Sequence, residues 1–520
     1  MDMVKNALGR MVPTEMDGVK LKPYQSAFAT QGGGKKYGRT ITTSKPGQDK
    51  VVNGIKKAIK ASGLKSGMTI SFHHHLRNGD YVVNMVLEAC AEMGIRDLTL
   101  APTALFPIHK PVIDHIKNGV VRNIQGSMNG PIVYFVSLGG METTAVLRSH
   151  GGRVRAIHDG DLKIDVAFLA APSCDKYGNA NGTDGPAACG PLAYGHADSH
   201  YGETVVMVTD NLVEYPCMPF SIRQTNVDLV CVVDSIGDPA GIMTGTMRLT
   251  KSPTRLKIAQ LAADFIRESP VYREGYSFQT GAGGISLAIS KFIADYMKED
   301  KITASFINGG ITAPIVEMFH NGQTRKLFDG QIFDTAGIKS FRDDLYHMEM
   351  TMDMYANIHS KGCIVNLQDV GFLGATEIDV DYNVNVNTHS DGLLLHGIGG
   401  HSDVAAGAGI SMMVVPSYRK RIPVIRDAVT TVTTPGETVD VVVTERGIAI
   451  NPLRKDLIDH YAKSKLPIKT INQIKDEVEA FCGKPAEPRL KDRIVALIEY
   501  RDGTIIDAVR QVDLPMPESF

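Results

Sequence analysis

The chain has 520 residues, of which 43% are hydrophobic and 22% are charged, and its formal net charge is -2. This length exceeds what a single ordinary core needs, so we expect two or more domains in a soluble globular protein. A nearly neutral chain lacks the basic footprint of proteins that bind nucleic acid or anionic membranes, and we expect neither partner.

The N-terminus has no apolar segment of the kind that a signal peptide carries, and no apolar run approaches the ~20 residues of a membrane helix. We therefore expect a cytoplasmic protein. The seven cysteines are scattered without a CxxC pair. They predict small buried residues rather than a disulfide framework or a zinc site.

Residues 1–49 contain the glycine triplet Gly32–Gly34 and many lysines, and we expect them to form a loosely packed N-terminal arm. Beyond this arm, helical and strand patterns alternate to the end of the chain. This alternation predicts an α/β architecture with mainly parallel sheets.

An internal repeat divides the chain into two halves. The strand, polar turn and helix expected for residues 67–92 recur at 275–300. Three short matches follow in the same order at a similar spacing: Ser71-Phe72 with Ser277-Phe278, Ile164–Val166 with Ile378–Val380, and Val227-Asp228 with Val439-Asp440. We therefore predict two homologous α/β domains in tandem, residues 50–240 and 241–520. A crevice is expected where the carboxyl ends of their strands face each other.

The first half carries a basic cluster, His73-His74-His75-Leu76-Arg77, at the end of a predicted strand. Strand alternation places His73 and His75 on one face and His74 on the other. Arg77 could hold a carboxylate through two hydrogen bonds. Anion binding, a metal site that would need a third ligand from elsewhere, and ordinary loop histidines all stay open.

Gly281, Gly283 and Gly284 lie in a turn between the predicted strand YSFQT and the helix that follows it. Small residues let a ligand approach the backbone, and the first turn of a helix offers unpaired N–H groups to an anion. The alternative is a tight turn without a ligand.

A second glycine loop contains Gly397, Gly399 and Gly400, followed by His401 and Asp403. We expect both loops to reach one crevice, where their amides would stabilise a developing oxyanion. His401 and Asp403 would orient a carboxylate or a thioester carbonyl. The alternative is that they only cap the loop through hydrogen bonds.

Several motifs follow one another along the second half: QTGAGG, GATEID, VNVN, SDGLLLHGIGGHSDVAAGA and VDVVVTERGIAINP. Together they resemble the CoA-transferase superfamily. SFHHHLRNGD, IDVAFLAAPSCDKYGNANG and IEYRDGTIIDAVRQV make the chain similar to the citrate lyase alpha subunits over about residues 50–515. The resemblance implies two tandem CoA-transferase-like domains, and glycine loops that bind a CoA-like arm.

The resemblance also implies a reaction, in which citrate exchanges with the acetyl group of a carrier-protein thioester to give citryl-carrier and acetate. The cosubstrate would be CoA or the phosphoribosyl-dephospho-CoA arm of an acyl carrier protein (the gamma subunit), with no tightly bound cofactor and no metal. A lyase beta subunit would share the complex, and a homo-oligomer is expected within it. Citrate carries about three negative charges, so His73, His75, Arg77 and Asp403 are its candidate ligands.

Many CoA-transferases carry a nucleophilic glutamate where this chain reads Ala304–Thr312, a segment without a carboxylate. This departure favours direct exchange in a ternary complex, through a transient anhydride. Asn308 and the amides of Gly309 and Gly310 would then place and polarise the substrate.

Two glutamates and one basic run have alternative interpretations. If a glutamate does react, Glu377 and Glu317 are the first candidates; otherwise Glu377 is a paired strand carboxylate and Glu317 lies on a solvated helix face. The run Tyr418–Arg421 would contact the phosphates of a CoA-like arm or an acidic carrier protein, or form a solvated loop.

Two other functions also fit the sequence. One is a CoA-transferase for acetate, hydroxybutyrate or citramalate that uses free acyl-CoA, and the other is a non-catalytic scaffold that binds CoA-like arms.

Overall fold

The computed structural model describes residues 2–29, 47–243, 249–281, 283–518 and 520. The Gly32–Gly34 triplet and Ala282 of the first glycine turn lie outside these residues. Within the described ranges, no helix is long and apolar enough to cross a membrane.

The first half folds around a seven-stranded sheet in which every neighbouring pair of strands is parallel. In spatial order the strands are β5 (Val51–Asn53), β17 (Leu229–Val232), β15 (Thr204–Thr209), β12 (Val166–Ala170), β6 (Thr69–Phe72), β7 (Leu98–Pro102) and β9 (Val121–Ile124). The helices of this half are α1 (Ile55–Ser62), α2 (Val82–Glu92), α3 (Val112–Lys117), α4 (Pro131–Ser137), α5 (His150–Asp159) and α6 (Gly195–Tyr201). The sequence VAFLA of β12 is buried throughout, as expected for a parallel strand that helices cover on both faces.

The second half contains an eight-stranded sheet that is parallel except for its last pair. In spatial order the strands are β21 (His347–Glu349), β20 (Leu327–Ile332), β19 (Phe306–Ile311), β18 (Ser277–Thr280), β22 (Val370–Leu373), β25 (Ile410–Val414), β29 (Val441–Thr444) and β30 (Gly447–Ile450). Its helices are α7 (Pro253–Glu268), α8 (Gly284–Asp300), α9 (Ala313–His320), α10 (Thr335–Asp343), α11 (Met352–Ala356), α12 (His401–Gly407), α13 (Lys455–Tyr461) and α14 (Ile471–Cys482).

The two halves repeat one topology. The strand order β17-β15-β12-β6-β7-β9 corresponds to β29-β25-β22-β18-β19-β20. Each half also has a three-stranded sheet with one antiparallel and one parallel pair. These small sheets are β14 (Ala180–Asn181), β13 (Ser173–Asp175) and β16 (Leu212–Val213), and β24 (Val384–Asn385), β23 (Glu377–Asp379) and β28 (Ile425–Arg426). The prediction of two homologous α/β domains with mainly parallel sheets is confirmed.

One of the three short sequence matches is in structural register. Asp228 accepts a hydrogen bond of 2.8 Å from the Val205 amide, and Asp440 accepts one of 2.7 Å from the Ser411 amide. Both bonds lie at the start of the corresponding strands β15 and β25. The match of Val227-Asp228 with Val439-Asp440 is therefore correct.

Hydrogen bonds show that the other two sequence matches are out of structural register. Asp165 accepts a bond from the Thr69 amide, and its counterpart is Asp369, which accepts one from the Ser277 amide. Asp369 lies ahead of the segment that the sequence match selected. The same two bonds align Thr69 with Ser277, so the match that began at Ser71 is shifted by two residues.

The described part of the N-terminal arm is packed, and the expectation of a loose arm is wrong there. Residues 2–29 form the hairpins β1 (Met3–Lys5) with β2 (Met11–Pro13) and β3 (Glu15–Met16) with β4 (Val19–Lys20). Asn6 Nδ2 donates to the Ile506 carbonyl oxygen at 2.8 Å. Tyr24 is fully buried, and its hydroxyl donates to the Glu437 carboxylate at 2.8 Å.

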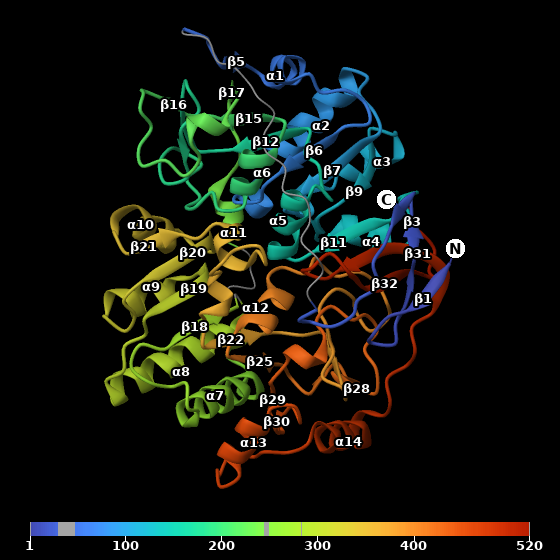
Figure 1. Ribbon diagram of the computed structural model, residues 1–520, viewed down its shortest axis with the longest axis vertical. Helices are drawn as coiled ribbons and strands as arrows, with labels where there is room; N and C mark the ends of the chain where they lie inside the picture. Colours follow the sequence, from blue (N-terminus) through green and yellow to red (C-terminus); the bar gives the residue numbers. More distant parts are fainter. Residues whose placement is uncertain (1, 30–46, 244–248, 282, 519) are drawn as a thin grey trace.

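The end of the chain returns to the first half. Strands β31 (Leu490–Glu499) and β32 (Ile505–Val512) form a sheet with β11 (Ala145–Arg148). One apolar core cluster contains residues of both halves, so the interior is continuous between them. Helices α5, α11 and α12 lie at this junction (Figure 1). The domain boundary at residues 240 and 241 stays a prediction.

Replacing Tyr24 with alanine should lower the thermal midpoint of the protein. The change removes a fully buried ring and its edge-on contact with Tyr500, whose ring centroid is 5.2 Å away, at a cost on the order of 3 kcal/mol. Val19→Ala is the control, because this side chain of the same arm is 61% exposed. Scanning calorimetry of the wild type and both variants measures the thermal midpoints. A midpoint of Tyr24→Ala equal to that of the wild type would show that the packing of the arm adds no stability.

Candidate active site

The three histidines that follow β6 are buried, with exposed fractions of 6% for His73, 4% for His74 and 2% for His75. The rings of His73 and His75 lie together with their centroids 4.0 Å apart and contact each other through their Nδ1 atoms. His74 turns instead to the Thr103 hydroxyl, at 2.5 Å. His73 Nε2 lies 2.7 Å from the Ala170 carbonyl oxygen, so the cluster joins the carboxyl ends of the neighbouring strands β6 and β12.

These histidines are neutral near pH 7. Burial lowers the pKa of His73 to about 4. Burial, together with neighbouring basic side chains, lowers the pKa values of His74 and His75 well below the ordinary value. A neutral imidazole has one N–H donor and one acceptor nitrogen. The cluster therefore supplies hydrogen bonds rather than positive charge.

Arg77 supplies permanent positive charge at the same place. Its guanidinium lies between the rings of Phe106, at 5.1 Å, and Phe333, at 4.9 Å, one ring from each half. Nη1 donates to Gln331 Oε1 at 3.4 Å, whereas Nε is buried without a hydrogen-bond partner among the described residues. Burial lowers the pKa of Arg77, but a guanidinium keeps its proton at pH 7. The two rings fix the plane of the guanidinium, and its Nε donor stays unused among the described residues.

Asn308, Gly309 and Gly310 form a bulged part of β19. Gly309 has a φ of 110°, and the pairing with β20 shifts in register between the two glycines. A Cβ at Gly310 would overlap the ring of Phe333, so glycine is required there. Asn308 is 1% exposed and donates to Gln279 Oε1 at 3.1 Å, and its own Oδ1 has no partner among the described residues. Bulges of this kind occur beside active sites, where they re-aim backbone groups.

Gln279 and Tyr355 connect the two glycine loops. Gln279 lies on β18, two residues before Gly281, and exchanges hydrogen bonds of 3.1 and 3.2 Å with the Tyr355 hydroxyl. A Cβ at Gly400 would come within 2.5 Å of that hydroxyl. Gln279, which precedes the first glycine turn, and Gly400 of the second loop therefore border the same tyrosine, and Gly400 is small because the tyrosine is close.

His150 and Tyr194 continue these contacts into the first half. The His150 amide donates to the Gly399 carbonyl oxygen at 2.9 Å, and His150 Nε2 lies 3.1 Å from the Tyr194 hydroxyl. The Tyr194 ring packs on His74 with centroids 4.3 Å apart. Burial lowers the pKa of His150 to about 4 and raises that of Tyr194, so both are neutral. A continuous series of contacts thus runs from Asn308 to His74, across the two halves.

The first glycine turn is open to approach from outside. Gly281 and Gly283 are exposed, and a Cβ at Gly283 would meet open space. Gly283 has a φ of −83°, which any residue adopts, and it precedes Gly284, the first residue of the 17-residue helix α8. Since neither packing nor backbone conformation requires glycine at 283, a bare backbone here suits a ligand that approaches the first amides of the helix.

Residues 48–512 match the sequence profile of the family described as citrate lyase, alpha subunit (CitF). The citrate lyase alpha chains of Klebsiella pneumoniae and Haemophilus influenzae are 47% and 45% identical over 466 and 464 residues. These alignments cover 89% of this chain in both cases and 92% and 93% of the relatives. This chain belongs to the citrate lyase alpha subunit family. The prediction from the sequence motifs, a transferase-type enzyme of the citrate lyase complex, is confirmed.

Solved structures agree with this assignment. An alpha subunit of citrate lyase from Streptococcus mutans, in complex with citrate, matches at a TM-score of 0.94 and 48% identity, covering 98% of this chain and 99% of that one. A Pseudomonas malonate decarboxylase hetero-tetramer matches at a TM-score of 0.61 and 16% identity, over 83% and 86% of the chains. A 4-hydroxybutyrate CoA-transferase from Porphyromonas gingivalis matches at 0.52 and 17%, over 83% and 97%. The last two show the fold alone, which is that of the CoA-transferases.

Glu377, the first candidate for a reactive carboxylate in this citrate lyase alpha subunit, lies in a buried ion pair. It is fully buried against Arg426, and its Oε2 accepts hydrogen bonds from Asn385 at 2.9 Å and the Thr430 amide at 2.8 Å. Burial raises the pKa of the carboxyl group, but Arg426 and these hydrogen bonds outweigh burial and lower the pKa. The ionised group is already used to hold β23 against β28.

His401 has both ring nitrogens occupied. Nδ1 lies 2.7 Å from Thr434 Oγ1, and Nε2 lies 2.8 Å from the Gly374 carbonyl oxygen. Burial lowers the pKa of His401 to about 4. In the alpha subunit this ring therefore ties α12 to two loops, which corresponds to the loop-capping alternative rather than to a group facing substrate.

Asp403 holds the start of α5 on both sides of His150. Its carboxylate accepts hydrogen bonds of 2.9 Å from the Ser149 hydroxyl and 2.9 Å from the Gly151 amide. It is fully buried, with Arg501 Nε 3.8 Å away, and burial raises its pKa. The structure thus brings Asp403 to the crevice as a residue that positions His150.

The remaining candidates have different surroundings. A Cβ at Gly397 would overlap Ser127, so this glycine is a packing requirement. Glu317 is exposed on α9, as predicted for a solvated helix face. Arg419 donates to two carbonyl oxygens of the loop between β22 and β23, at 2.9 and 2.6 Å, and Arg421 donates to the Phe481 carbonyl oxygen at 3.2 Å. Two of the three basic side chains in that run are therefore bound to the protein itself.

The seven cysteines are free, and six of them are buried, as the sequence predicts. Among the residues that the structure describes, no group of three or more His, Cys, Asp or Glu side chains could hold a metal ion.

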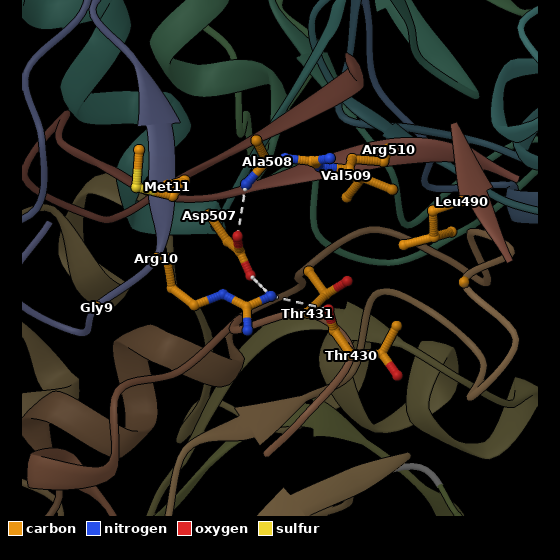
Figure 2. Close-up of a pocket in the computed structure, with 11 residues that line it drawn as sticks. Gly9, Arg10, Met11, Thr430, Thr431, Leu490, Asp507, Ala508, Val509 and Arg510 are labelled. Carbon is orange, nitrogen blue, oxygen red and sulfur yellow. Dashed lines mark hydrogen bonds and ion pairs between the residues drawn. The ribbon is translucent and has the colours of Figure 1, made fainter. Parts of the chain in front are cut away.

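A separate cavity of about 230 Å³ lies between the N-terminal arm and the C-terminal sheet (Figure 2). Its Arg10 pairs with Asp507 at 2.8 Å and donates to the Thr430 carbonyl oxygen at 2.9 Å. Because the charge is used within the protein and none of the crevice residues lines this cavity, it is no candidate for the active site.

The sequence does not single out Gln279, Tyr355, His150 and Tyr194, although all four join the crevice. Gln279 lies inside the motif QTGAGG, which is the one signal that could have indicated it. The other three come from separate segments without a motif, and only the folded chain brings them together.

The buried neutral histidines predict a loss of stability on mild acidification. His73, His150 and His401 have pKa values of about 4 in the folded protein, below the ordinary value near 6.5. Between these values the unfolded chain binds more protons. The free energy of unfolding therefore falls as the pH falls from about 6.5 to 4, by up to about 1.4 kcal/mol per pH unit for each histidine.

Thermal midpoints recorded between pH 7 and 5 test this prediction. His401→Gln should flatten the pH dependence, because one titrating group is removed. The control is His320→Gln, since the His320 side chain is 55% exposed. The same slope in the wild type and in both variants would contradict the neutral, buried state.

Proposed function

We propose that this alpha subunit transfers a thioester from acetyl to citrate: acetyl-carrier protein, or acetyl-CoA, and citrate give the citryl thioester and acetate. The observation that carries the proposal is the series of contacts from Asn308 to His74. It joins a carboxylate-free bulge on β19, the strand that leads into the first glycine turn, the second glycine loop and His74, whose backbone shares Gln331 with Arg77. The acyl carrier protein with its CoA-like arm, the lyase beta subunit, a homo-oligomeric state and a cytoplasmic location belong to the same proposal.

The exchange needs two acyl transfers and no redox partner. A citrate carboxylate oxygen attacks the acetyl carbonyl carbon; a C–O bond forms, the C–S bond breaks, and a mixed anhydride and a thiolate result. The thiolate then attacks the citryl carbonyl carbon of the anhydride. A new C–S bond forms, the anhydride C–O bond breaks, and acetate leaves with the electron pair. Protons balance without an external acid or base.

The side chains divide this work by their charge. Arg77, with an unused donor, binds a citrate carboxylate. The ring nitrogens of His73 and His75 already contact the Ala170 carbonyl oxygen, each other and the Tyr194 amide, so these neutral rings shape the site without adding charge. Asn308 and the amides of Gly309 and Gly310 stabilise negative oxygen in the transition states. Holding both acyl groups in one site supplies much of the rate, because the exchange becomes intramolecular.

Direct exchange is supported by the lack of a free carboxylate on β19. The strand reads FINGGI, and Glu377 is committed to Arg426. We therefore propose a ternary complex without a glutamyl intermediate. Glu377, His401 and Asp403 act in it as positioning residues.

Citryl-CoA formation from acetyl-CoA and citrate tests the function. The purified chain should produce citryl-CoA, detected by mass spectrometry, and release an equal amount of acetate. Product with citramalate, acetate or hydroxybutyrate but not with citrate would favour a related CoA-transferase. No product with any acid, from protein that still binds CoA, would favour a scaffold.

Trapping separates the two routes of transfer. Protein incubated with acetyl-CoA and then with hydroxylamine or borohydride should carry no modified glutamate by peptide mass spectrometry, because no glutamyl thioester forms. Glu377→Gln should lower the thermal midpoint, since it weakens a buried ion pair, and the folded fraction should still turn over. A glutamate modified only after incubation with acetyl-CoA would overturn direct exchange.

A further inference from the structure

Gln331, on β20 of the second half, contacts the basic cluster of the first half through both ends of its side-chain amide. Its Oε1 accepts a hydrogen bond from Arg77 Nη1 at 3.4 Å, and its Nε2 donates to the His74 carbonyl oxygen at 3.2 Å. The side chain is 4% exposed. A guanidinium only donates and a carbonyl oxygen only accepts, so both contacts are satisfied in one orientation of the amide. Gln331 is therefore a fixed acceptor beside Arg77.

A bulge near the end of β20 gives Gln331 this place. The pairing of β19 with β20 skips Gly330, so Gln331 stands opposite Gly310. An extra residue of this kind re-aims the side chain that follows it. Two positions further along the chain, the ring of Phe333 stacks on the Arg77 guanidinium at 4.9 Å. One short segment of the second half thus supplies both a ring for the face of the guanidinium and an acceptor for its edge.

The backbone of Arg77 also shows that this side chain is held in one place. Its φ is 53°, in the left-handed region that residues other than glycine rarely adopt. Such a conformation persists where the surrounding structure fixes it, and it is frequent at binding sites. Phe106 and Phe333 fix the plane of the guanidinium, and Gln331 fixes its rotation within that plane. Nε and Nη2 donate to none of the described residues, so they remain for a ligand.

The neutrality of the amide at position 331 matters as much as its geometry. A carboxylate there could also accept from Arg77, but it would neutralise the guanidinium and repel a carboxylate of the ligand. His74, the other partner of Gln331, is neutral because burial lowers its pKa. No carboxylate among the described residues pairs with Arg77, and the pKa of the guanidinium is lowered by burial. A poorly solvated positive charge without a partner favours an anionic ligand.

We propose that Gln331 is the positioning residue for citrate. It orients the Arg77 guanidinium so that Nε and Nη2 meet a citrate carboxylate, and as a neutral acceptor it leaves the positive charge to that carboxylate. The inference rests on the proposed thioester transfer, in which Arg77 binds citrate, and adds the residue of the second half that aligns it. Because Gln331 acts through Arg77, changes at this position should affect citrate and spare the thioester.

Calorimetric titration with citrate and the KM values of the exchange test Gln331→Met and Gln331→Glu. Methionine has a similar size but makes neither hydrogen bond, so Gln331→Met should weaken citrate binding about fivefold. Glutamate can still accept from Arg77 but adds a negative charge, so Gln331→Glu should weaken citrate binding at least about thirtyfold. The KM for acetyl-CoA should not change in either variant. A glutamine that only joined the two halves would give the reverse order, because glutamate keeps the contact with Arg77 and methionine loses it.

Gln368→Met is the matched control. Gln368 is 2% exposed, and its Nε2 donates to the Val370 carbonyl oxygen at 3.0 Å. It lies ahead of β22, at the amino ends of the strands and so at the opposite edge of the sheet from the crevice. This variant should lower the thermal midpoint, because a buried hydrogen bond is lost, and leave the citrate affinity unchanged.

Binding and turnover together separate a failed orientation from a failed function. Citrate binding that weakens in the predicted order supports Gln331 as the positioning residue, even if no citryl-CoA forms. Folded variants with wild-type citrate affinity, or weaker binding by Gln331→Met than by Gln331→Glu, overturn it, even if exchange with citrate occurs. A wild type that does not bind citrate overturns the inference together with the proposed function. If Gln331→Met does not fold, Gln331→Glu against the wild type decides, because glutamate and glutamine have the same shape.

Discussion

The guanidinium of Arg77 between Phe106 and Phe333 is the contact on which the crevice depends. One ring comes from each half, so the contact holds a positive charge at the junction of the two halves. A guanidinium does not lose its proton in response to burial, whereas an imidazole does. Burial makes the neighbouring histidines neutral, and for His74 the charge of Arg77 adds to this effect, because a second positive charge in a poorly solvated site is costly. A substrate with several carboxylates brings the negative charge that this site lacks.

Close packing explains which glycines are needed. Gly310 faces the ring of Phe333, and Gly400 faces the hydroxyl of Tyr355, so a methyl group at either position would separate surfaces that now touch. Gly283 differs, because open space lies beside it. The first two glycines allow close packing against these rings, and the third leaves the backbone accessible. Glycine therefore has two physical roles in this structure: close packing at Gly310 and Gly400, and an open backbone at Gly283.

Alternation of strands and helices, and the position of glycines between them, were sufficient to predict the two parallel sheets and the segments that meet at their carboxyl ends. Register was not predictable from short identities. Asp165 and Asp379 share their neighbours in sequence, but hydrogen bonds to the start of the adjacent strand make Asp369 the counterpart of Asp165. Such bonds join residues about ninety positions apart along the chain and leave no local pattern.

The roles of single polar residues were least predictable, because each depends on a distant partner. The sequence leaves Glu377 open between a reactive and a paired strand carboxylate until Arg426 is placed against it. It leaves Asp403 open between a substrate ligand and a loop cap until Asp403 is seen to hold both neighbours of His150. In each case burial makes an unpaired charge costly, so the fold supplies a partner. The same reasoning bears on the mechanism. The buried carboxylates Glu377 and Asp403 are already neutralised or hydrogen-bonded, and Asn308, in the segment where many CoA-transferases carry a nucleophilic glutamate, keeps an unpaired amide oxygen among the described residues. A neutral amide in this segment adds no negative charge that could compete with the carboxylate of a substrate for the Arg77 guanidinium.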